Sequence, residues 1–279
     1  MPLVPPNLAQ VILLLSAALL FILGALASIA RLRHKSHAMS LLVKSLDYWG
    51  ICGALTGLVW RCIDRGSILP LGDNFQTLAA LGVLLAMFSI YMQTIRPVPG
   101  LDWFVMPIAA LLLVGAAIFG RFMPDRYRAD SVWTFTHLLS SFGGTVAFAV
   151  AAAVGCMYLR VSANLRRKPA APAPNFTSLE RLENIAHAAA ILGFALWTLG
   201  MITGLAIVIH EGSHTLLGRY PLATPKVILA FAAWVVYALA LHTPMTPALR
   251  GRKSAYLSVV GFILILGTII AVQFTPGGR

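Results

Sequence analysis

Histidines are the side chains of this sequence best suited to binding a metal ion or a haem iron. Four of the seven, His137, His210, His214 and His242, lie within or beside long apolar runs. An ionisable side chain inside lipid is costly, so it usually marks a binding site or pairs with a neighbouring helix. Each of the four is therefore a candidate ligand. A structural histidine that hydrogen bonds to a neighbouring helix is the alternative at every position.

Two of these histidines belong to the sequence HEGSH at residues 210–214. On a helix, HExxH places two imidazoles on one face to bind zinc, with the glutamate activating water. A catalytic zinc also needs a third protein ligand, and Gly212 weakens the helix at this point. A polar helix end is the preferred interpretation of this segment. An outer axial ligand for haem is the second interpretation, and a metalloprotease site is the least favoured.

Depth in the membrane decides which histidines can share one iron. His137 is expected about 10 Å inside the outer end of its helix, at about 1.5 Å of rise per residue. His242 is expected about 24 Å below the outer surface by the same rise. The two cannot bind one iron, whereas His137 can pair with His210 or His214 at the outer side.

Apolar helices must position these side chains. Of the 279 residues, 59% are hydrophobic and only 11% are charged, which is too few charges for a water-facing surface. A spanning helix needs about 20 apolar residues. Seven runs meet this need, and residues 43–63 predict an eighth helix with Asp47 and Arg61 at its ends. We therefore expect an all-α polytopic membrane helix bundle of about eight helices; the seven runs without charge are 1–30, 74–95, 103–120, 131–159, 184–209, 227–249 and 254–278.

Charge predicts the orientation of this bundle. With the N-terminus outside, the inner connections hold 13 of the 21 Lys and Arg residues, which favours both termini outside. The net charge of +12 then serves topology and contact with anionic lipid. The basic residues are dispersed over short loops, so nucleic-acid binding is not expected. The predicted inner connections are 31–47, 96–102, 160–183 and 250–253.

Cysteines and prolines limit the remaining possibilities. Cys52, Cys62 and Cys156 form no CxxC pattern, so no covalent c-type haem site and no zinc knuckle is expected. Residues 166–178, RRKPAAPAPNFTS, are expected to form a cytoplasmic linker because prolines interrupt a helix. We divide the chain into residues 1–47, a first helix with a basic loop, and residues 48–279, the main membrane domain.

The C-terminal half carries a recognisable pattern. Residues 217–242 read LGRYPLATPKVILAFAAWVVYALALH, and residues 251–266 read GRKSAYLSVVGFILIL. This stretch resembles the tryptophan-rich loop and following helices of the cytochrome c assembly family, the Ccs/Ccm-type haem-handling membrane proteins. The likeness is dispersed but collinear over residues 50–272. The residues in register are Gly218, Tyr220, Pro225, Lys226, Ala230, Trp234, Tyr237, Ala238 and His242.

The resemblance implies particular haem contacts. His137 matches the family's first external histidine, and His242 matches a transmembrane histidine. Tyr220 and Trp234 match the loop and the helix that follows it. The aromatic residues of the loop are replaced, which resembles the HemX-like branch, and the second external histidine has no counterpart before Arg279. The aromatic residues are replaced at Leu217, Pro221, Ala223 and Leu229, and Thr224 replaces the aspartate of the loop.

A haem-handling role in cytochrome c biogenesis is the function that this resemblance implies. Such a protein would bind haem b without being an enzyme, in a bacterial-type inner (plasma) membrane. Its expected partners are membrane lipid, haem, and another assembly subunit or apocytochrome. The alternative is a non-catalytic membrane regulator or complex subunit that keeps the fold without binding haem, which the altered loop favours.

Overall fold

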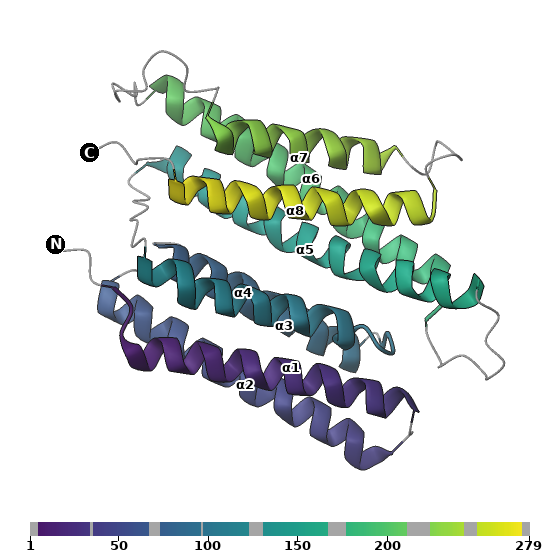
Figure 1. Cartoon of the computed structure of the whole chain (residues 1–279). Coiled ribbons are helices and arrows are strands. Elements are labelled where there is room, and N and C mark those ends of the chain that lie inside the picture. Colours follow the sequence, from purple (N-terminus) through teal and green to yellow (C-terminus); the bar gives the residue numbers. More distant parts are fainter. Residues whose placement is uncertain are drawn as a thin grey trace. The chain divides into compact units, whose positions relative to one another are not determined.

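In the part of the chain that the computed structural model describes, all regular secondary structure is α-helical (Figure 1). That part comprises residues 5–33, 36–66, 73–95, 97–122, 131–166, 177–210, 224–242 and 250–274. The eight helices are α1 (Leu8–Arg33), α2 (His37–Arg65), α3 (Asn74–Thr94), α4 (Asp102–Phe122), α5 (Val132–Arg166), α6 (Leu179–His210), α7 (Pro225–Leu241) and α8 (Arg252–Phe274).

Six of these helices are long and apolar enough to cross a membrane: α1, α3, α4, α5, α6 and α8. Helix α7 is equally apolar but has only 17 residues. Helix α2 has 29 residues and carries Lys44, Asp47 and Arg61 in its interior. The predicted all-α polytopic membrane bundle is confirmed.

The sequence prediction for α2 was wrong in its limits. Asp47 and Arg61 do not end the helix: it begins at His37 and continues to Arg65, and both side chains are buried. Most of the predicted inner loop 31–47 is consequently helical, since α1 reaches Arg33. Lipid excludes charge, so a charged side chain in an apolar run predicts a helix end, but a buried partner on or beside a neighbouring helix serves equally well.

The helices form two compact units. Unit 1 comprises Met1–Arg128 with Ala163–Ser178, and it contains α1 to α4. Unit 2 comprises Ala129–Ser162 with Leu179–Arg279, and it contains α5 up to Ser162 together with α6 to α8.

In unit 1, α1 packs against both α2 and α4, and α3 packs against α2 and α4. Capping residues determine where α2 ends and where α3 begins. Gly66 ends α2 in the left-handed conformation, with φ of 63°, which glycine adopts without steric cost. Asp73 then caps α3, because its side chain accepts a hydrogen bond from the Gln76 backbone N–H at 2.7 Å.

In unit 2, close contacts between α5, α6 and α7 show which residues of these helices lie side by side. A Cβ on Gly144 of α5 would lie 3.0 Å from the Trp197 backbone nitrogen of α6. Further along α5, the Phe148 ring stacks on Tyr237 of α7, with ring centroids 3.5 Å apart. Helix α6 runs antiparallel to α5, because His137 contacts Gly200 whereas Phe148, further along α5, contacts Gly193. Helix α7 runs antiparallel to α6, because Phe194 stacks on Trp234 whereas Trp197 donates through Nε1 to the Ala230 carbonyl at 3.4 Å. Helix α7 is therefore parallel to α5.

Candidate functional site

His137 lies near the start of α5 and is half-buried against α6. Its Nδ1 lies 2.7 Å from the Gly200 carbonyl oxygen. Gly204, one turn further along α6, lets the ring approach closely, because a Cβ at this position would lie 3.0 Å from the His137 Cε1 atom. Two glycines four residues apart on α6 therefore form the seat for this imidazole, and a neighbouring helix contacts it as expected.

This hydrogen bond determines which ring nitrogen of His137 is available. A carbonyl oxygen can only accept, so Nδ1 must carry the proton and donate it. In the neutral imidazole the lone pair is then on Nε2, the nitrogen that would bind a metal. Ligating histidines in metalloproteins are held by this kind of Nδ1 contact to a backbone carbonyl. His137 is therefore oriented as a ligand, although the same bond would satisfy a structural histidine.

His242 repeats this arrangement at the end of α7. It is the C-cap residue, its side chain is exposed, and its Nδ1 lies 2.7 Å from the Ala238 carbonyl oxygen. Nδ1 again donates, and Nε2 is left with the lone pair. The polar group within its reach is thus a carbonyl of its own helix.

His137 and His242 lie at opposite ends of unit 2. Phe148 and Tyr237 stack, so they mark a common level on the parallel helices α5 and α7. His137 precedes this level by eleven residues and His242 follows it by five, and these sixteen residues correspond to about 24 Å of helix at about 1.5 Å per residue. A separation of about 24 Å is larger than the sequence suggested and agrees with the prediction that one iron cannot bind both.

Trp234 of α7 is the centre of an aromatic stack. The sequence singled out Trp234 but not the rings that pack on it. The Phe194 ring of α6 stacks on it at 5.3 Å, and the Phe231 ring of its own helix at 5.9 Å, measured between centroids. Its indole Nε1 donates to the Thr198 hydroxyl at 2.9 Å. The spacing of Phe231 and Trp234 puts both on one helix face, so their contact could have been predicted from the sequence. The contacts of Phe194 and Thr198 could not, because they depend on how α6 pairs with α7.

Three candidate residues fall outside the described part of the chain in whole or in part. His214 and Tyr220 belong to residues 211–223, which the structure does not describe. His210 is the last residue of α6, and its side chain is likewise outside the description. Its backbone follows Gly204 on α6, so it lies at the end of unit 2 that also holds His137. The HEGSH motif therefore keeps the status of a prediction.

A buried ionic cluster in unit 1 was not predicted from the sequence. Arg31 of α1 pairs with Asp102 of α4 at 2.7 Å, and Gln93 of α3 donates to Asp47 of α2 at 3.0 Å. Asp47 is fully buried and Asp102 is 1% exposed. The signal was the presence of Asp47 in an otherwise apolar stretch, which was interpreted as a helix end.

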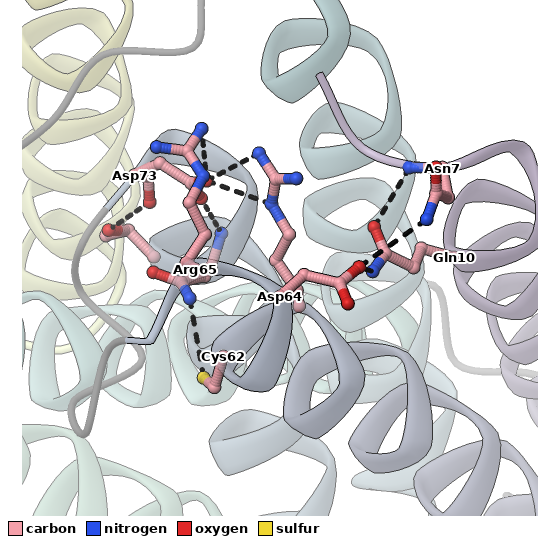
Figure 2. A network of polar contacts seen from close by, with 9 residues as sticks. Asn7, Gln10, Cys62, Asp64, Arg65 and Asp73 are labelled. Carbon is pink, nitrogen blue, oxygen red and sulfur yellow. Dashed lines mark hydrogen bonds and ion pairs between the residues drawn. The ribbon is translucent and has the colours of Figure 1, made fainter. Parts of the chain in front are cut away.

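A second ionic network lies at the other end of unit 1 (Figure 2). The Asp73 carboxylate forms ion pairs with Arg61 at 2.9 Å and with Arg65 at 3.1 Å. The Arg61 guanidinium also lies over the Phe75 ring. Gln10 of α1 donates to Asp64 of α2 at 2.7 Å in the same view. The network thus joins the ends of α1, α2 and α3.

The three cysteines are free. Cys52 is exposed, and Cys62 and Cys156 are half-buried. Cys62 accepts a hydrogen bond from the Gln76 side chain at 3.4 Å.

Comparison with known proteins identifies the family. Residues 39–277 match the sequence model of the family described as Cytochrome C assembly protein. The chain belongs to this family. The match covers α3 to α8 in full and α2 from residue 39 onward, so it includes helices of both units.

Individual relatives agree with this assignment. Cytochrome c biogenesis protein CcsA of Prochlorococcus marinus (strain NATL1A) is 28% identical over 244 residues, which cover 81% of this chain and 72% of the relative. CcsA of P. marinus subsp. pastoris is 36% identical, but over 37% of this chain and only 32% of the relative.

A solved structure supports the fold. Cytochrome c Heme Lyase CcmF superposes with a TM-score of 0.63 over 95% of this chain, at 14% sequence identity. The chain spans about half of CcmF, because the match covers 47% of that chain.

Proposed function

We propose that this protein binds haem b non-covalently and positions it at the outer face of the plasma membrane during cytochrome c assembly. The observation that supports this function is the hydrogen bonding of His137 and His242, the two histidines that match the family's ligand positions. Both donate through Nδ1 to a backbone carbonyl at 2.7 Å, so both present Nε2 as a ligand. The family and its CcsA relatives connect the chain to cytochrome c biogenesis.

His137 is the residue we propose as the principal iron ligand. Its ring is seated on α6, where Gly200 and Gly204 fix its position, and a fixed imidazole loses little freedom on binding a metal. A second axial ligand can come from the end of α6, where His210 and His214 follow. His242 would serve a separate haem position at the opposite end of unit 2. These residues would bind and orient haem before it is handed on.

The proposed role is binding and transfer rather than catalysis. Handing on a cofactor requires neither a nucleophile nor an acid–base pair, only ligands that release it to a partner. We propose that this partner is an apocytochrome or another assembly subunit. We propose the plasma membrane as the location, and the distribution of Lys and Arg favours an orientation with both termini outside.

A regulator or complex subunit that binds no haem is the second candidate. The altered loop favours it, since Leu217, Ala223 and Leu229 replace aromatic residues of the family pattern. Aromatic rings provide a large stacking surface for a flat ligand, which aliphatic residues replace only in part.

Absorption spectroscopy of the purified protein separates the two candidates. We expect a Soret band and a sharp α band on reduction, as for haem held by two histidines. In His137→Ala we expect most of the haem to be lost, while membrane insertion is unchanged. His37→Ala is the matched control, because His37 is an exposed histidine at the start of α2 in unit 1.

A second variant tests the other end of unit 2. His242→Ala should lower haem content if haem enters from the cytoplasmic side. Unchanged haem content in both His137→Ala and His242→Ala would mean that these histidines are structural. The regulator would then be the better assignment.

A further inference from the structure

The buried cluster around Asp47 in unit 1 contains more negative charge than positive charge. The charged groups that act on Asp47 from the helices packed around it are Arg31 of α1 and Asp102 of α4, and α3 contributes the neutral Gln93. Lys44, on α2 itself, is half-exposed. Within the buried part, two carboxyl groups therefore face one guanidinium.

Several oxygens of this cluster lack a donor. Within the part of the chain that the structure describes, Asp47 Oδ1, Gln93 Oε1 and Asp102 Oδ1 are buried and have no hydrogen-bond partner. Leaving a buried polar atom unsatisfied costs about 1–3 kcal/mol, and more if it is charged. Three unsatisfied acceptors beside a surplus negative charge indicate that a positive charge with donor capacity belongs in this cluster.

The two carboxyl groups differ in how well they hold their negative charge. Asp102 forms an ion pair with Arg31 at 2.7 Å. It is also the first residue of α4, where the helix dipole favours an anion. Asp47 lies in the interior of α2, and its one donor is the neutral amide of Gln93 at 3.0 Å. A buried charge without an ionic partner is far costlier than a neutral acid. Asp47 is thus the group that takes up a positive charge.

We propose that Asp47 is a proton-binding site, occupied in the state that the structure describes. The proton is carried on Oδ1, because Oδ2 already accepts from Gln93. An O–H on Oδ1 supplies the donor that this group of oxygens lacks. A hard metal ion fits less well, because such ions take about six to eight oxygen ligands and the Arg31 guanidinium would repel them.

The surroundings of Asp47 connect its proton to helix packing. A Cβ on Gly24 of α1 would lie 2.5 Å from Asp47 Oδ1, so the absence of a side chain there makes room for this oxygen. Arg31 has 18% of its side chain exposed, so the cluster lies one side chain below the surface of the unit. Loss of the proton would set Asp47 in competition with Asp102 for Arg31, and would weaken the contact between α1 and α4.

Infrared spectroscopy of the full-length protein in detergent at neutral pH tests this site. We expect the carbonyl stretch of a protonated carboxylic acid, shifted in D2O, and its loss in Asp47→Asn. In Gln93→Leu the band should persist at higher frequency, because the carbonyl loses its hydrogen bond. Asp64→Asn is the control, since Asp64 is an exposed acid at the other end of α2 and its removal should leave the band unchanged.

The result that overturns the proposal is an acid band that is unchanged in both Asp47→Asn and Gln93→Leu, or no acid band at all. A band that appears only after sodium and divalent cations are removed would make a metal ion the occupant, and would equally overturn it. Gln93→Leu keeps the test decisive if Asp47→Asn does not fold.

Discussion

The two units bury different kinds of polar group. All four buried charged residues among the described residues lie in unit 1: Asp47, Arg61, Asp73 and Asp102. The buried polar side chains described in unit 2 are hydroxyls, Ser140, Thr145, Ser162, Thr203 and Ser258. Unit 1 is therefore joined by ion pairs between helices. Unit 2 is joined by glycine contacts and stacked rings.

This difference separates stability from the proposed binding function. Ion pairs in a low-dielectric interior fix helices in one arrangement, and losing one partner is severe. A hydroxyl that donates to its own helix does not fix the arrangement of neighbouring helices in this way. Thr203, which donates to the Leu199 carbonyl at 2.8 Å, is an example. Both proposed haem ligands that are described, His137 and His242, lie in unit 2, so a ligand can be gained or lost there without leaving a charge buried.

The largest effect is expected in unit 1, for Asp73→Ala. This change leaves Arg61 and Arg65 buried without the carboxylate that both contact, at 2.9 and 3.1 Å. Removing one partner of a buried ion pair costs about 3–5 kcal/mol. Thermal unfolding in detergent should show the loss. Asp64→Ala, at an exposed acid in the same network, is the control and should cost far less.

If Asp73→Ala and Asp64→Ala were equally mild, the ion pairs of unit 1 would not be its main link. The comparison of the two units would then be wrong.

The next effect is expected in unit 2, for Gly144→Val. A Cβ here would meet the α6 backbone, 3.0 Å from the Trp197 nitrogen and 3.2 Å from the Gly193 oxygen. Overpacking of this kind costs about 1–3 kcal/mol. Gly267→Val is the matched control, because the nearest atom to its Cβ is Leu229 Cδ1 at 3.6 Å. Equal thermal stability of the two variants would contradict the close approach of α5 and α6.

Some of this organisation could be predicted from the sequence. Runs of about 20 apolar residues gave the helices because lipid requires an internally bonded backbone. His137 was identified because an imidazole in an apolar run needs a partner. The Gly200 carbonyl that supplies this partner was not predictable, since it depends on how α5 and α6 pair.

Asp47 and Arg61 show where the sequence was insufficient. A charge in an apolar segment has two solutions, the membrane surface or a buried partner, and the sequence alone favoured the surface. Their partners, Gln93 and Asp73, lie on or beside α3. Only the three-dimensional contact between helices could select the second solution.

The smallest effect is expected for the hydrogen bond from Trp234 to Thr198. Hydrogen bonds between membrane helices contribute about 0.6 kcal/mol on average, because the unfolded chain in the membrane also finds partners. Trp234→Phe keeps an aromatic ring between Phe194 and Phe231 but removes the indole N–H that donates at 2.9 Å. Thr198→Val removes the acceptor instead. Both variants should lower thermal stability slightly.

The double variant distinguishes this hydrogen bond from loss of packing. If the bond is the shared cause, Trp234→Phe with Thr198→Val should cost less than the two single changes added together, since the bond is lost only once. Additive costs would mean that ring size and methyl packing, not the hydrogen bond, join α6 to α7 at this level. Haem content measured on the same three proteins then adds a second readout. A loss of haem in Trp234→Phe but not in Thr198→Val would assign the indole ring a direct contact with the porphyrin, because both variants lose the same hydrogen bond and only one changes the ring.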